Sequence, residues 1–269
     1  MAYPMQQFSK PEVIEFSRMF STDSAKAIKA SGYGYLNGIN YMAPYNVAGK
    51  GTVCSDASAG CKALCLGMES GQAAIRKEGG TNKTVESRIR KTRYFFAQTQ
   101  AYLCELVWHV HKLVQQAAKQ DLIPVVRLNG SSDIAYERAK IRAYGGKTIF
   151  EIFPNVQFVD YTKKLNRLTD NVPANLDLTF SLHEENRDKA AEAIRRGFNV
   201  AVIFADFLPD SYDLGDGPIQ VIDGDKHDLR FLDPKTGVIV GLLPKGRKAK
   251  ADDSGMVVRD HFNILKLAA

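Results

Sequence analysis

Residues 176–205, LDLTFSLHEENRDKAAEAIRRGFNVAVIFA, decide the fold of this 269-residue chain. Apolar runs at 176–181 and 199–205 flank a segment of helix-forming residues at 184–196, which ends before Gly197, a helix stop signal. A buried strand, a helix and a second buried strand make up the repeating unit of parallel α/β sheets. The stretch therefore predicts an α/β fold.

The same alternation extends to both sides of this stretch. Further apolar runs rich in Val, Ile and Phe occur at 123–128, 156–160, 218–222 and 237–243. A spacing of about twenty residues per unit is typical of a β/α barrel. The main rival is a doubly wound open sheet, but no run is followed by the G-x-G-x-x-G turn of dinucleotide-binding sheets. We therefore predict a single-domain, partial TIM-like β/α barrel with an N-terminal cysteine loop.

This prediction divides the single domain, residues 1–269, into consecutive segments. Helix formers dominate the longest helical pattern, which no Pro or Gly interrupts. The segments are an N-terminal helix and strand in 1–48, a cysteine loop for metal in 49–72, one long helix in 83–120, and β/α units in 121–260.

The composition is that of an ordinary globular protein, with 45% hydrophobic and 25% charged residues. No apolar run is long enough to cross a membrane, and the first residues lack the pattern of a secretion signal. We therefore expect a cytoplasmic protein with no membrane partner. The net charge of +6 fits an anionic partner, either nucleic acid or a phosphorylated small molecule, but it also fits a merely solubilising charge.

Three of the four cysteines lie within twelve residues, 54-CSDASAGCKALC-65, as Cys54, Cys61 and Cys65. In a reducing compartment, clustered thiols more often bind metal than form disulfides. Structural zinc usually has two close ligand pairs, whereas three cysteines suit a [4Fe–4S] cluster with one iron free of protein thiolate. Zinc and free thiols stay open as alternatives. Cys104 lies in an apolar helical register, which predicts a buried core cysteine.

Polar side chains follow the predicted strands, where β/α folds gather their binding sites. Some have simpler explanations, because Asp133 or Glu184 could cap or begin a helix and Asp223-Gly224 is a common turn. Together they predict a pocket for a polar or anionic ligand beside the cysteines. Its expected residues are Arg127, Asn129, Asp133, Asp160, Lys163, Glu184, Asp223, Asp225 and His227.

A second hypothesis is a nucleic-acid-binding protein whose metal is structural. Basic residues adjoin aromatic ones in the long predicted helix, so phosphates and bases could both be contacted. The alternative is a helix with an apolar core face and a solvated basic face. The residues concerned are Lys83, Arg88, Arg90, Lys91, Arg93, Tyr94, Phe95 and Phe96.

The motifs CSDASAGCKALC, RIRKTRYFF, VVRLNGSSDIAYE, FVDYTKK, LTFSLHEEN and VIDGDKHDLRFLDPKTGVIVGLLPKG occur in this order. They resemble the phage gene-product-eighty-eight family, which implies a phage protein in the bacterial host cytoplasm but no particular reaction. A cysteine loop before β/α strands is also distantly similar to radical S-adenosylmethionine enzymes, and that resemblance would imply S-adenosylmethionine as a cofactor. Those enzymes use C-x3-C-x2-C, a spacing that this chain does not share.

Overall fold

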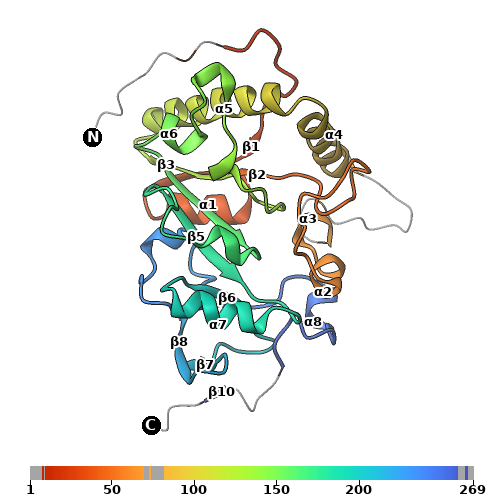
Figure 1. Ribbon diagram of the computed structural model, residues 1–269, viewed down its shortest axis with the longest axis vertical. Helices are drawn as coiled ribbons and strands as arrows, with labels where there is room; N and C mark the ends of the chain where they lie inside the picture. The colour runs from red at the N-terminus through yellow and green to blue at the C-terminus, as the bar shows by residue number, and fades with distance from the viewer. Residues whose placement is uncertain (1–7, 9, 70–72, 74–81, 260–263, 266–269) are drawn as a thin grey trace.

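The computed structural model describes residues 8, 10–69, 73, 82–259 and 264–265 (Figure 1). The last residues of the predicted cysteine loop, 70–72, and the last residue of the predicted β/α units, 260, lie outside this set, as do most of the residues at both chain ends. Among the described helices, none combines the length and the apolar composition needed to cross a membrane.

One mostly parallel sheet organises the described chain. Its strands follow the spatial order β1 (Phe20–Ser21), β2 (Tyr35–Asn40), β3 (Ile123–Arg127), β4 (Gln157–Thr162), β5 (Leu176–Ser181), β6 (Val200–Ile203), β9 (Ile239–Leu242), β8 (Pro218–Asp223), β7 (Ser211–Asp213) and β10 (Ile264–Leu265). All neighbours from β2 to β8 pair in parallel, whereas β1, β7 and β10 pair antiparallel. The predicted α/β fold is therefore confirmed.

The predicted barrel is not found, because the sheet is open in the described part of the chain. Consecutive strands from β2 to β6 are neighbours, as they would be in a barrel. However, β1 pairs with the outer edge of β2, and β7 pairs with the outer edge of β8. The edges of β2 and β8 that a barrel would join are therefore partly occupied, at Ile39 and Asn40 of β2 and at residues 218–220 of β8.

Helices of very different length connect the strands. They are α1 (Ala25–Ser31), α2 (Ala59–Ala63), α3 (Leu66–Glu69), α4 (Lys83–Ala97), α5 (Thr99–Lys119), α6 (Ile149–Ile152), α7 (Arg187–Arg195) and α8 (Arg247–Lys250). The long helix predicted for 83–120 is thus two helices, because Gln98 leaves the helical region at φ −142° and ψ 57°. Figure 1 shows α4 turning away from α5 at this point.

The two faces of the sheet differ in chemistry, because successive strand residues point to opposite faces. Val126, Phe158 and Phe180 belong to the main hydrophobic core, which also holds the buried side of α5. On the opposite face, Val125 and Val159 pack in a small cluster. Two residues further along each strand, this second face carries polar groups in place of apolar ones. The carboxyl edge of that face therefore provides the polar surface on which a site can form.

Candidate functional site

A cavity of about 210 Å³ lies at the carboxyl edge of the sheet, and the cysteine loop forms part of its wall. Cys54, Cys61 and Cys65 all line it. The remaining wall comes from the ends of strands β3 to β6 and β9, including Arg127 and Lys163. The structure therefore brings the three clustered thiols and the predicted strand-end residues to one place.

Hydrogen bonds from the sheet hold the cysteine loop in this position. Ser58 caps α2, because its Oγ accepts a hydrogen bond of 3.1 Å from the Cys61 backbone N–H. The backbone N–H of Gly60, one residue before Cys61, donates to Glu184 Oε1 at 2.7 Å. At the other end of the loop, the Asp133 backbone N–H donates to the Val53 carbonyl at 2.8 Å. The cysteines are therefore tied to the loops that follow β3 and β5.

Burial makes two of the loop thiols, Cys54 and Cys65, less acidic. It raises the pKa of Cys54 to about 11 and that of Cys65 to about 12, and the ammonium of Lys163 opposes both shifts. Among the described residues, no three His, Cys, Asp or Glu side chains are grouped as ligands of one metal ion. Cys104 lies elsewhere, half-buried in α5 against the main core.

Arg127 and Lys163 give this edge of the sheet its positive charge. Arg127 Nη1 pairs with Asp228 Oδ2 at 2.7 Å, and its guanidinium lies 4.7 Å from the centroid of the Tyr161 ring. The Tyr161 hydroxyl donates to Asp228 Oδ1 at 3.1 Å. Lys163 Nζ donates to Ser181 Oγ at 2.8 Å. Arg127 is thus held by a buried carboxylate, while the Lys163 ammonium donates to a neutral hydroxyl.

Two of the predicted pocket residues serve to shape the loop after β3. Asn129 donates to Asp160 Oδ2 at 2.9 Å and accepts a hydrogen bond from the Ile134 backbone. Asp133 accepts hydrogen bonds from Thr162 and the Lys163 backbone. Both line the cavity, but their hydrogen-bonding atoms are used within the protein.

Three predicted residues do not line either cavity at this edge. Asp160 shares the strand face of Phe158, is 1% exposed and accepts a hydrogen bond from the Asn129 backbone N–H. Burial raises its pKa to about 6. The Glu184 carboxylate accepts a hydrogen bond from the backbone at the amino end of α2. Asp223 accepts a hydrogen bond from the Asp225 backbone in a turn. The structure therefore does not place these three predicted residues, Asp160, Glu184 and Asp223, in the wall of either cavity.

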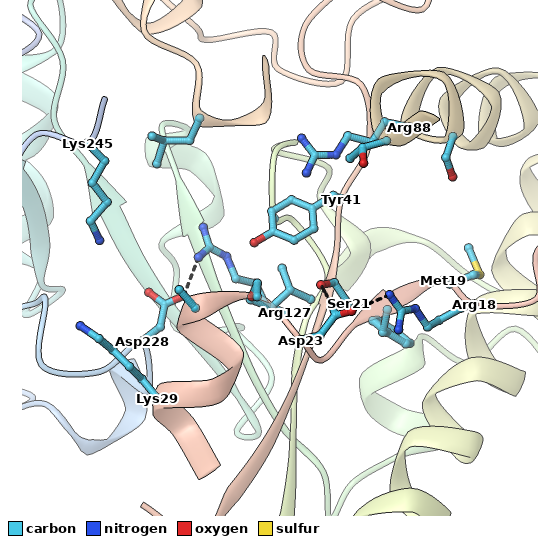
Figure 2. A pocket seen from close by; sticks show the side chains of 18 of the residues that line it. Arg18, Met19, Ser21, Asp23, Lys29, Tyr41, Arg88, Arg127, Asp228 and Lys245 are labelled. Carbon is cyan, nitrogen blue, oxygen red and sulfur yellow. Dashed lines mark hydrogen bonds and ion pairs between the residues drawn. The ribbon is translucent and has the colours of Figure 1, made fainter. Parts of the chain in front are cut away.

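A larger cavity, of about 1080 Å³, adjoins the first (Figure 2). Arg127, Leu66, Gly130 and Lys245 line both cavities, so the two share a wall. The predicted residues Asp225 and His227 belong to this larger cavity. Burial lowers the pKa of His227, so its imidazole is largely neutral at neutral pH.

The predicted basic and aromatic surface does not form as a unit. Lys91 is buried and donates to the Met19 carbonyl and to Asn40 Oδ1. Tyr94 and Phe95 pack against the main core. Lys83, Arg88 and Lys91 line the larger cavity, whereas the other members of the set do not.

Several site residues were not predicted, namely Tyr41, Tyr161, Asp228 and Lys245. Two signals in the sequence could have found part of this set. Tyr161 lies two residues after Val159 in the same strand. The alternation of strand residues therefore places both on the face of the sheet opposite the main core. Asp228 closes the run DGDKHD and Lys245 follows the last predicted strand.

A model of the Gene product 88 family matches residues 17–260. This match supports the predicted phage family, and it gives no support to the radical S-adenosylmethionine resemblance. No curated protein and no solved structure matches the chain.

Proposed function

We propose, since this chain belongs to the Gene product 88 family, that it is an iron–sulfur member that binds a [4Fe–4S] cluster through Cys54, Cys61 and Cys65. A polar or anionic ligand would bind beside the cluster at the carboxyl edge of the sheet. The observation that carries the proposal is that all three thiols line one cavity together with Arg127 and Lys163.

The donor set fits a cluster better than a single ion. A structural zinc ion usually has four protein ligands that converge on a single point, whereas three cysteines line this cavity. In a four-iron cluster each thiolate binds a different iron, so its ligands stand further apart. Three thiolates also make the assembly anionic, and Arg127, Lys163 and Lys245 supply positive charge in the same cavity.

The chain's own residues would control access and charge at this place. Metal binding requires the thiols to lose their protons, and burial opposes this at Cys54 and Cys65. The ammonium of Lys163 favours both thiolates. A bound cluster would supply an iron without a protein thiolate, to which a ligand of this cavity could bind.

The test is the metal content of the protein purified without oxygen from iron-replete cells. The proposal expects a brown protein with broad visible absorbance, and iron and sulfide in equal amounts. Replacing any one of the three loop cysteines by Ser should lower both. Cys104→Ser is the matched control, because that thiol packs against the hydrophobic core instead of lining the cavity. Zinc without iron, or iron lost equally in the control, would overturn the proposal.

A further inference from the structure

The larger cavity has more positive than negative side chains. Without Lys91, whose pKa burial lowers to about 7, six lysines and arginines line it, against three aspartates. These basic residues come from the segment before β1, from α1, from α4, and from the ends of β3 and β9, so distant segments converge (Figure 2). Side chains of like charge that surround one cavity repel one another unless an anion lies between them. The excess therefore points to an anionic ligand.

Pairing within the protein does not remove this excess. Asp23 pairs with Arg18 at 3.1 Å, Asp225 with Lys245 at 2.8 Å, and Asp228 with Arg127. Each aspartate thus already has a basic partner from the cavity wall.

Arg88 is the arginine of this cavity that has no carboxylate partner among the described residues, whereas Arg18 and Arg127 each have one. Its guanidinium lies 4.6 Å from the centroid of the Tyr41 ring and donates to the Gly67 carbonyl. Both contacts fix its position and neither neutralises it. Figure 2 shows Arg88, Tyr41 and Arg127 next to one another in the cavity.

The first turn of α4 adds to the positive potential. Lys83 and Thr84, the first two residues of α4, line the cavity together with Ser87. The helix runs for fifteen residues from Lys83. The amino end of a helix carries a partial positive charge and favours phosphate groups. Hydroxyl and ammonium donors at this end are typical phosphate contacts.

We infer that the larger cavity binds a small molecule that carries phosphate groups, with its phosphates held between Arg88, the first turn of α4 and Lys245. The inference extends the ligand-binding part of the proposed function and does not depend on the cluster. The cavity volume of about 1080 Å³ is slightly above the range of small-molecule sites, roughly 300–1,000 Å³, so a small molecule fits within it.

A nucleic acid strand is the less suitable occupant. Binding of a strand needs a row of exposed aromatic side chains on which bases stack. The aromatic side chains of α4 do not provide it, because Tyr94 and Phe95 pack against the core and Phe96 is a single exposed ring, not a row. The Tyr41 ring already carries the Arg88 guanidinium on one side.

The test is calorimetric titration of the full chain with ADP, inorganic pyrophosphate and adenosine, and with a single-stranded oligonucleotide. ADP and pyrophosphate should bind, and adenosine should not. Arg88→Gln should weaken pyrophosphate binding by about tenfold, as expected for a lost charge-assisted contact. Lys83→Gln gives a second reading if Arg88→Gln disturbs the fold, and it should weaken binding about threefold.

Lys147→Gln is the matched control, because it removes the same charge from an exposed residue that lines neither cavity. Its affinity for pyrophosphate should stay within about twofold of the unchanged protein. Equal weakening by all three variants, or binding of the oligonucleotide without ADP or pyrophosphate, would overturn the inference. Iron content is measured in the same samples, so that loss of the cluster and loss of anion binding are distinguished.

Discussion

Glu184 Oε1 accepts a hydrogen bond of 2.7 Å from the backbone N–H of Gly60, 124 residues earlier in the chain. This contact joins the loop after β5 to the amino end of α2, the helix that carries Cys61. A Cβ atom at Gly60 would lie 2.8 Å from the same carboxylate oxygen and closer still to Ser254 Oγ, so these side chains would have to shift to admit a larger residue. The carboxylate therefore fixes where the cysteine helix can lie.

Glu184→Ala should loosen α2 without unfolding the sheet. A hydrogen bond to a charged group contributes about 1.5–3 kcal/mol, and its loss frees a helix of only five residues. The measurement is the rate at which Cys61 reacts with a thiol reagent in metal-free protein, which should rise. Glu185→Ala is the control, since that side chain is exposed. Equal rates of Cys61 reaction in both variants would contradict the positioning role of Glu184.

Arg167→Met should lower the free energy of unfolding strongly. The Arg167 side chain is fully buried and pairs with Asp133 at 2.6 Å and with Glu137 at 2.9 Å. Its removal leaves two buried carboxylates without a cation, at a cost of about 3–5 kcal/mol. Urea denaturation measures the loss. Arg195→Met, which breaks exposed ion pairs with Glu192 and Asp216, should cost less than about 1 kcal/mol.

The buried ammonium of Lys91 should make stability rise with pH above neutrality. Burial lowers its pKa from 10.5 to about 7 in the folded protein. Between these values the unfolded chain binds a proton that the folded protein does not, so the free energy of unfolding rises with pH. The contribution approaches about 1.4 kcal/mol per pH unit.

Lys91→Met removes this group, so the difference between its unfolding curve and that of the unchanged protein isolates the effect. Urea titrations at a series of pH values from neutral to about 10 provide the measurement. The variant should show a flatter pH dependence whatever its absolute stability. Lys147→Met, at an exposed position, should keep the original slope. A variant slope equal to that of the unchanged protein would contradict the assignment.

Asp228→Asn should strengthen anion binding while it weakens the fold. Asp228 pairs with Arg127 at 2.7 Å and accepts a hydrogen bond from Tyr161. The amide leaves the Arg127 charge available to a ligand, so affinity for pyrophosphate should rise by about tenfold, equivalent to about 1.4 kcal/mol. Calorimetry measures the affinity and urea denaturation the stability. Unchanged or weaker binding would mean that Arg127 does not contact the anion.

The parallel strands could be predicted because their signal is local. Each of β3, β5 and β6 is a short apolar run next to a turn or helix signal, and such runs are read directly from the sequence. The edge strands could not. β1 has two residues and β7 has three, which is too short for any period to show. The open sheet therefore depends on pairings that have no sequence pattern of their own.

The same limit explains which site residues were predicted. Arg127 and Lys163 were found because both lie at the carboxyl end of a predicted strand. Asp160 was wrongly placed in the pocket because β4 continues to Thr162, so Asp160 is a strand residue facing the core. The ion pair of Arg127 with Asp228 spans 101 residues, and no spacing rule joins residues that far apart. Helix α4 ends at Ala97, and neither Gly nor Pro follows it there, so the sequence did not predict this end either.

The position of β9 has a consequence for the order in which the chain can assemble during synthesis. β8 is made before β9, yet its parallel partner is β9, which lies between β8 and β6. On the ribosome β8 must therefore wait until β9 has emerged before it can join the sheet. Leu242 and Lys245, which complete the wall around the cysteines, also come from this late segment. The three thiols are thus made early and enclosed last, which leaves them accessible for most of translation.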